Sequence, residues 1–166
     1  ALIRPVARGL VHAAVRLRPY AIVRDGTLER GWDVEYEDGC VQDMVRQTTK
    51  PEPYVISPAF VNAHSHLEYR HFQGAFPTLS YWPWLRALTE AKRECDAPTC
   101  RRAAALAARE NRETGVALIA EHADQPFSGP AMEAAGLRGI VFCEVITFFE
   151  HASPSEKLRA AEEKAR

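Results

Sequence analysis

Apolar and polar positions change their pattern partway along the chain. Up to about residue 52, short apolar runs alternate with turn signals, which are Asp25-Gly26, Arg30-Gly31 and Asp38-Gly39. Such pairs between short apolar runs are typical of β-hairpins. Residues 1–52 are therefore predicted to form a small β-rich appendage, and the segment Lys50-Pro51-Glu52-Pro53 marks its end.

Beyond this boundary, apolar runs alternate with segments of helical periodicity. Strands are predicted over residues 54–62, 116–120 and 139–146. Helices are predicted over residues 81–94, 98–114 and 130–135, and another opens at Ser153 with the spacing of a capping box. This alternation indicates β/α units around a parallel sheet. Residues 53–166 are therefore expected to contain three β/α units, and the fold class is α/β.

The number of units limits the architecture. A closed barrel of eight β/α units typically needs about 250 residues, whereas this chain has 166. Two interpretations follow, a small open α/β sheet or the front part of a larger TIM-type (β/α)8 barrel, incomplete in this chain.

Composition and charge narrow the class of function. The net charge is −1, with acidic and basic residues mixed along the chain, which argues against a nucleic-acid partner. The apolar runs are too short to span a bilayer. The four cysteines form no Cys-x-x-Cys pair, so reduced thiols are expected. We expect a cytoplasmic protein that binds a small molecule and neither nucleic acid nor a membrane.

Two histidines, His64 and His66, follow the first apolar run in the sequence SPAFVNAHSHLEYR. Alternate side chains of a strand share a face, so Asn62, His64 and His66 are expected to point the same way. Two imidazoles held in this way can chelate one metal ion, and α/β proteins build their sites at the ends of parallel strands. The pair alone leaves open two ordinary surface or hydrogen-bonded histidines.

The stretch SPAFVNAHSHLE resembles the first-strand signature of the amidohydrolase superfamily, in which both histidines bind the catalytic metal. Residues 72–85 are similar to the Arg-Gly and Trp-Leu segment of its nucleoside and aminopurine deaminase branch. Residues 115–122 look like the second strand of that branch, and residues 137–148 are similar to the third strand of aminodeoxyfutalosine deaminases. Ala59 and Gln73 stand where the family usually has Gly and Arg, so the substrate stays open.

The resemblance covers about residues 54–150 and implies the N-terminal portion of a metal-dependent deaminase of an aminated purine nucleoside or an aminodeoxyfutalosine-like compound. His64 and His66 would hold a divalent metal, zinc before iron, which activates a water molecule for attack on the carbon that bears the amine. The family takes its other ligands and its acid/base residue from later strands, and nothing after Glu144 matches them. No catalytic residue is therefore assigned, and the missing groups would come from the rest of the barrel or from a homo-oligomer.

Four further residues are candidates for substrate binding. Glu68 follows the histidine pair on the same face, with an exposed acid as the alternative. Trp84 can stack on a base, although tryptophans on amphipathic helices are usually core residues. His122 closes the second predicted strand and is otherwise a hydrogen-bonded structural residue. Glu144 lies within an apolar run, where an unpaired carboxylate is costly, and the alternative role is a salt bridge with Arg138.

Two other functions stay open. A non-catalytic truncated half-barrel, or interaction fragment, would agree with the missing ligands, and its exposed strand edges would favour association. A hydrolase of cyclic amides or chlorinated heterocycles would use the same scaffold and differ in the leaving group.

Overall fold

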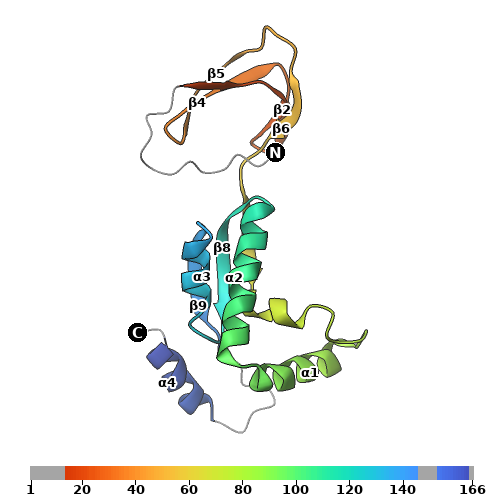
Figure 1. Cartoon of the computed structure of the whole chain (residues 1–166), viewed down its shortest axis with the longest axis vertical. Coiled ribbons are helices and arrows are strands. Elements are labelled where there is room, and N and C mark those ends of the chain that lie inside the picture. The colour runs from red at the N-terminus through yellow and green to blue at the C-terminus, as the bar shows by residue number, and fades with distance from the viewer. Residues whose placement is uncertain (1–13, 146–152, 165–166) are drawn as a thin grey trace. The chain divides into compact units, whose positions relative to one another are not determined.

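The computed structural model describes residues 14–145 and 153–164. The chain divides into two compact units, Ala1–Ala59 and Phe60–Arg166, which we call the β unit and the α/β unit (Figure 1). The division falls after Ala59 rather than at the expected boundary near residue 52, because the strand that begins at Glu52 pairs within the β unit.

Six strands of the β unit form two three-stranded sheets, in the orders β1-β4-β5 and β3-β2-β6. The strands are β1 (Val15–Leu17), β2 (Pro19–Arg24), β3 (Thr27–Glu29), β4 (Trp32–Glu37), β5 (Cys40–Arg46) and β6 (Glu52–Ile56). All neighbours are antiparallel except β2 and β6, which run parallel with Pro19 opposite Glu52 and Ile22 opposite Ile56. The β-rich character expected from the turn signals is therefore present in residues 14–56.

Two of the predicted turns close hairpins in this unit. Asp25 and Gly26 join β2 to β3 with φ angles of 49° and 74°, and Asp38 and Gly39 join β4 to β5 with φ angles of 49° and 83°. Positive φ at both central positions is the two-residue turn whose twist matches that of the flanking strands. Asp tolerates this conformation, and Gly adopts it without steric cost.

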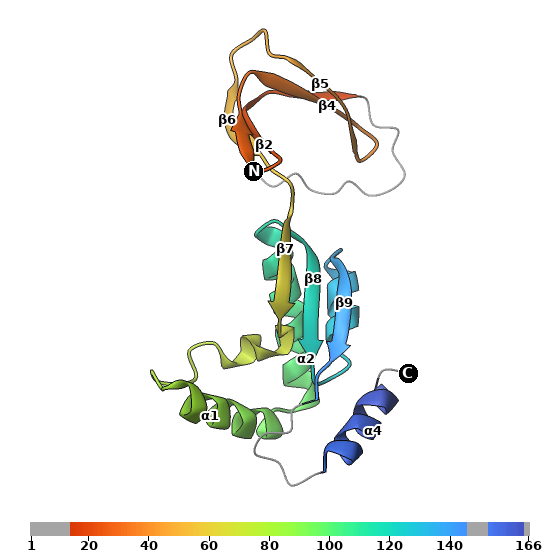
Figure 2. The same ribbon diagram turned by 180° about the vertical axis from the view of Figure 1, so that it is seen from behind.

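Three parallel strands form the sheet of the α/β unit, in the order β7-β8-β9 (Figure 2). They are β7 (Phe60–Ser65), β8 (Val116–Ala123) and β9 (Arg138–Cys143). The one strand predicted over residues 54–62 is thus two strands, β6 and β7, which belong to different sheets. Pro58 lies in the break between them and cannot donate a backbone hydrogen bond to a ladder, and β7 begins where the Phe60 N–H donates to the Gly115 carbonyl at 3.0 Å.

The helices predicted over residues 81–94, 98–114 and 130–135 are present with their ends within two residues of the prediction, whereas the short helix over residues 67–72 was not predicted. The helices of this unit are η1 (Leu67–Phe72), a 3₁₀ helix, then α1 (Tyr81–Glu94), α2 (Ala97–Glu113), α3 (Ser128–Ala134) and α4 (Pro154–Lys164). The capping box before α4 is confirmed, because the Ser153 N–H donates to Glu156 Oε2 at 2.8 Å and the Glu156 N–H donates to Ser153 Oγ at 3.3 Å. The predicted end of the third strand at Ile146 lies outside the described residues.

One face of the β7-β8-β9 sheet carries the core. Helices α2 and α3 cover this face (Figures 1 and 2), and their contact with it is dominated by small residues such as Ala104 and Ala108, both fully buried. The buried cluster consists of Leu67, Ala104, Ala107, Ala108, Val116, Ile119, Ala131, Met132 and Leu137. Small side chains let the helices approach the strands closely, so the covered face is packed by short residues.

The opposite face of the sheet is exposed within the described residues. Its apolar side chains include Val61, Leu118, Ile140 and Phe142, which are 42–62% exposed. The prediction of a mixed α/β fold is confirmed. Three strands in the described part of the chain do not close a barrel, so the complete (β/α)8 barrel stays a prediction. Among the described helices, none combines the length and apolar character needed to cross a membrane.

Candidate functional site

His64 and His66 converge at the carboxyl end of β7. The strand ends at Ser65, so His66 lies one residue beyond it, immediately before η1. Their Nε2 atoms are 3.2 Å apart. With zinc–nitrogen distances of about 2.05 Å, two nitrogens at this separation subtend an angle of roughly 103° at a shared ion. The structure therefore brings the predicted pair together at a spacing close to tetrahedral coordination.

Hydrogen bonding fixes which nitrogen of His66 is free. His66 Nδ1 lies 2.7 Å from the carbonyl oxygen of His122. A carbonyl can only accept, so Nδ1 carries the hydrogen and the lone pair of the neutral ring is on Nε2, facing His64. The ring of Tyr69 stacks on the other side of His66 at 4.4 Å with an interplanar angle of 5°. Metal-binding histidines are commonly oriented by such a carbonyl acceptor.

His122 forms the wall beside this pair. Its imidazole stacks on His64 at 4.1 Å and on Phe142 at 5.1 Å. Its Nδ1 atom is buried and makes no hydrogen bond with any described residue. His122 is thus part of the site through both its carbonyl and its ring.

Glu121, the residue before His122, connects three elements. It is 0% exposed, and its Oε1 accepts hydrogen bonds from the Leu67 N–H at 2.8 Å and from Ser128 Oγ at 2.7 Å. These bonds fix the start of η1 against β8 and α3, directly after His66. Its Oε2 is buried without a hydrogen-bond partner among the described residues.

Glu68 is buried, which excludes the alternative of an exposed acid at a strand end. It is 4% exposed, and its Oε1 accepts a hydrogen bond from the Asp124 N–H at 3.2 Å. Its Oε2 makes no hydrogen bond within the described residues. Burial raises the pKa of Glu68 to about 7, although the hydrogen bond from Asp124 opposes this shift. Glu68 therefore faces the site region with a carboxylate held away from water.

Tyr69, Lys92 and Asp124 form a polar cluster next to the histidines. Tyr69 donates its hydroxyl to Asp124 Oδ2 at 3.2 Å, and Lys92 donates to the Tyr69 hydroxyl and forms an ion pair with Asp124. Burial, followed by the nearby Asp124 carboxylate, raises the pKa of Tyr69 above its usual value, so the phenol stays protonated. Lys92 comes from α1, and the cluster therefore ties that helix to the end of β8.

The sequence did not assign a site role to Tyr69, Lys92, Glu121 or Asp124. One signal was present, because Asp124 directly follows the second strand at the edge where α/β proteins place their sites. The contribution of Lys92 depends on the packing of α1 against that edge, which no local pattern encodes.

Glu144 lies just past the end of β9, which ends at Cys143, and not inside an apolar strand as the sequence predicted. Its N–H donates to the Ala123 carbonyl at 3.1 Å. Its Oε2 is 3.9 Å from His66 Nδ1 and makes no hydrogen bond to a described residue. The alternative salt bridge with Arg138 is not formed in the described part of the chain.

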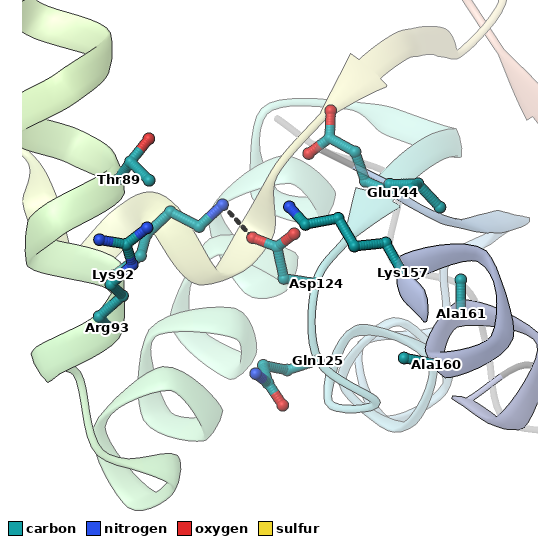
Figure 3. Close-up of a pocket in the computed structure, with 10 residues that line it drawn as sticks. Thr89, Lys92, Arg93, Asp124, Gln125, Glu144, Lys157, Ala160 and Ala161 are labelled. Carbon is teal, nitrogen blue, oxygen red and sulfur yellow. Dashed lines mark ion pairs between the residues drawn. The ribbon is translucent and has the colours of Figure 1, made fainter. Parts of the chain in front are cut away.

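Two cavities lie at the carboxyl edge of the sheet. The larger, of about 320 Å³, is shown in Figure 3 and has a charged lining formed by Lys92, Arg93, Asp124, Glu144 and Lys157. The smaller, of about 240 Å³, is lined by Glu68, Tyr69 and residues from the corner between α1 and α2. Three of the four predicted substrate-binding residues, Glu68, His122 and Glu144, gather in this region.

The fourth, Trp84, lies elsewhere on α1. It is 38% exposed, and its ring is 6.2 Å from that of Tyr81. It lines neither of the two cavities. The structure therefore does not bring Trp84 to the histidine pair within the described residues.

In the described residues, the histidine pair alone would not complete a metal site. These residues contain no group of three or more His, Cys, Asp or Glu side chains arranged to hold a metal ion. The two facing Nε2 atoms fit two coordination positions, and the anchored Nδ1 of His66 fits the usual support of a ligand. The pair would therefore supply two ligands of a metal ion, and a third would have to come from outside the described residues.

Neither a protein-family model nor a curated protein sequence matches the chain. Solved structures do. An aminofutalosine deaminase of Helicobacter pylori, in complex with methylthio-coformycin, matches with a TM-score of 0.64 and 19% identity over 90% of this chain and 39% of its own. An amidohydrolase of Brucella melitensis matches with a TM-score of 0.57 and 14% identity over 86% of this chain and 38% of its own.

A third structure, an amidohydrolase from an environmental sample of the Sargasso Sea, matches with a TM-score of 0.52 and 20% identity over 91% of this chain and 41% of its own. This chain thus spans about two fifths of the proteins it matches. At these identities the likeness is one of fold. The chain is thus similar in fold to part of an aminofutalosine deaminase and to part of two amidohydrolases, in agreement with the resemblance in its sequence.

Proposed function

We propose that this chain is the N-terminal part of a metal-dependent, amidohydrolase-type deaminase that acts on an aminated purine nucleoside or an aminodeoxyfutalosine-like compound. The observation that carries the proposal is the pair of facing Nε2 atoms, 3.2 Å apart at the carboxyl edge of a parallel sheet. The likeness of the fold to an aminofutalosine deaminase supports an amine as the leaving group.

The residues of this chain hold and surround the reaction centre. A divalent metal, zinc before iron, supplies a hydroxide at neutral pH when it is bound. His64 and His66 would be two of its ligands, and the carbonyl of His122 leaves the lone pair of His66 on Nε2, the atom that faces His64. The remaining ligands and the general acid/base belong, in this proposal, to later strands of a longer barrel.

Substrate binding is assigned to groups that are buried without a hydrogen-bond partner in the described residues. Three of the four such atoms are assigned, namely Glu68 Oε2, His122 Nδ1 and Glu144 Oε2. The fourth, Glu121 Oε2, is left out because the other oxygen of that carboxylate holds Leu67 and Ser128 in place. A buried polar group without a partner costs free energy, and a polar substrate that enters from the carboxyl edge would remove that cost. Trp84 has no part in this assignment, because it is 38% exposed on α1 and its ring contact is with Tyr81 and not with the histidines.

Zinc binding to the 166-residue chain tests the histidine pair. Isothermal titration calorimetry is expected to show one zinc-binding event, weakened at least about tenfold in His64→Ala/His66→Ala, since the variant loses both ligands. His71→Ala is the matched control, because His71 lies on η1 and is exposed. Unchanged zinc affinity in the double variant, or equal loss in the control, would contradict the assignment.

Product analysis tests the reaction in a polypeptide that contains the complete barrel. A deaminase releases ammonia from an aminated purine nucleoside, while a hydrolase of cyclic amides or chlorinated heterocycles gives a ring-opened acid or chloride. Zinc binding without ammonia release would overturn the proposed substrate and keep the metal site. Absence of zinc binding would favour the non-catalytic fragment, whose exposed apolar face predicts self-association in sedimentation.

A further inference from the structure

Two cysteine sulfurs meet at the corner between α1 and α2. Cys95 is the C-cap residue of α1, and Cys100 lies four residues into α2. Their Sγ atoms are 2.9 Å apart. The corner itself is fixed by Asp96, whose Oδ1 caps α2 by accepting a hydrogen bond from the Thr99 N–H at 2.7 Å. Local structure therefore holds the two sulfurs together.

The two thiols differ in their exposure to solvent. Cys100 is 9% exposed, whereas Cys95 is half-buried, and both line the cavity of about 240 Å³ that Glu68 also lines. The Cys100 S–H donates to Cys95 Sγ. Burial, followed by this hydrogen bond, raises the pKa of Cys100 to about 12. Cys100 therefore remains a thiol, and Cys95 is the sulfur that a small reagent in the cavity reaches first.

We propose that Cys95 and Cys100 form a dithiol site that hydroperoxides oxidise to an intramolecular disulfide. In the first step, the Cys95 thiolate attacks one peroxide oxygen, the S–O bond forms, the O–O bond breaks and hydroxide leaves. In the second, the Cys100 sulfur attacks Cys95 Sγ, the S–S bond forms, the S–O bond breaks and water leaves with the proton of Cys100. Two thiols lose two electrons, and hydrogen peroxide becomes two molecules of water.

The proposed bond would tie the end of α1 covalently to α2. Lys92, one turn before Cys95, carries the ion pair with Asp124 at the end of β8. Oxidation would therefore fix the helix that holds this contact beside the histidine pair. The other two cysteines, Cys40 in β5 and Cys143 in β9, are exposed and serve as internal controls for reactivity.

Peptide mapping of the reduced 166-residue chain after limited hydrogen peroxide tests the proposal. Arg93 and Arg101 flank the pair, so trypsin releases both cysteines in one peptide, residues 94–101. In the folded chain, this peptide is expected to lose two hydrogens at least about tenfold faster than Cys40 or Cys143 is oxidised, and 8 M urea is expected to remove that preference, since it depends on the folded environment of the thiols.

Variants with a single cysteine replaced test which of the two cysteines reacts first. In Cys100→Ser, Cys95 is expected to stop as a sulfenic acid that dimedone traps, and in Cys95→Ser, Cys100 is expected to stay reduced. Circular dichroism checks that each variant keeps its helices. Oxidation of Cys40 or Cys143 before the pair, a disulfide that joins either of them to another cysteine, or dimedone labelling at Cys100 would overturn the proposal. The map of the unsubstituted chain decides the matter even where a variant does not fold.

Discussion

The covered face of the β7-β8-β9 sheet and its carboxyl edge both bury side chains, but of opposite polarity. On the covered face, Ile119 and Met132 are 1% and 4% exposed in a wholly apolar cluster. At the edge, Glu68 and Glu121 are just as deeply buried, yet each keeps one carboxylate oxygen without a hydrogen-bond partner in the described residues. Such groups destabilise the folded state. The covered face therefore supplies stability, whereas at the edge stability does not explain why one oxygen of each carboxylate has no hydrogen-bond partner among the described residues.

The largest loss of stability is expected for a substitution on the covered face. Ile119→Ala should lower the free energy of unfolding by about 2–5 kcal/mol, because it removes fully buried methyl and methylene groups and leaves a cavity. Leu118→Ala, at the residue before Ile119 and 42% exposed on the open face, should cost less than about 1 kcal/mol. Urea unfolding followed by circular dichroism measures both changes. Equal losses would mean that the open face is also buried in solution, and the contrast between the faces would fail.

An intermediate loss of stability is expected for substitution of Glu121. Glu121→Ala leaves the Leu67 N–H and the Ser128 hydroxyl without their acceptor and should cost about 2 kcal/mol. Glu121→Gln keeps a carbonyl oxygen for both donors and should stay within about 1 kcal/mol of the original chain. The same urea titration compares the two variants. If the Gln variant loses as much as the Ala variant, the role of Glu121 depends on its charge and not on these two hydrogen bonds.

The smallest change in stability is expected at Asp96, the N-cap residue of α2. Hydrogen bonds from Thr99, first from its side chain and then from its backbone N–H, lower the pKa of Asp96 below its usual value. A lowered folded-state pKa stabilises the fold above the ordinary pKa of Asp, near 3.9, and this contribution is lost as the pH falls through the lowered value. Asp96→Asn keeps the cap without the charge.

Thermal unfolding at pH 7 and near pH 3 measures this contribution. The original chain should lose more of its thermal stability between the two pH values than Asp96→Asn does. An identical loss in both proteins would show that the charge of Asp96 does not stabilise α2.

The sequence predicts best where structure is local. Hairpin turns at Asp25-Gly26 and Asp38-Gly39, the bounds of α1 and the capping box at Ser153 all depend on residues close together in the chain. Pro58 lies within the strand predicted over residues 54–62 and disfavours a continuous strand there, since proline cannot donate to a ladder. The result, two strands in two different sheets, depends on the pairing of β6 with β2, which no local pattern specifies.

The candidate site is predicted only in part for the same reason. Strand alternation predicted that His64 and His66 converge, and they do, although His66 lies beyond the end of β7. His66 is anchored by the backbone carbonyl of His122. Every residue has a backbone carbonyl, so the type of residue at position 122 could not predict this contact. Lys92 reaches Asp124 from a separate helix, so this contact became visible only in three dimensions.

The parallel pairing of β2 with β6 has a consequence for synthesis of the chain. The hairpins β2–β3 and β4–β5 can form as soon as they leave the ribosome, because their contacts are local. The edge of β2 that receives β6 stays open until residue 56 emerges, when β7, the first strand of the next unit, is only a few residues behind. An open strand edge accepts other strands. Because β6 precedes β7 in the chain, it can pair with the open edge of β2 before β7 has emerged.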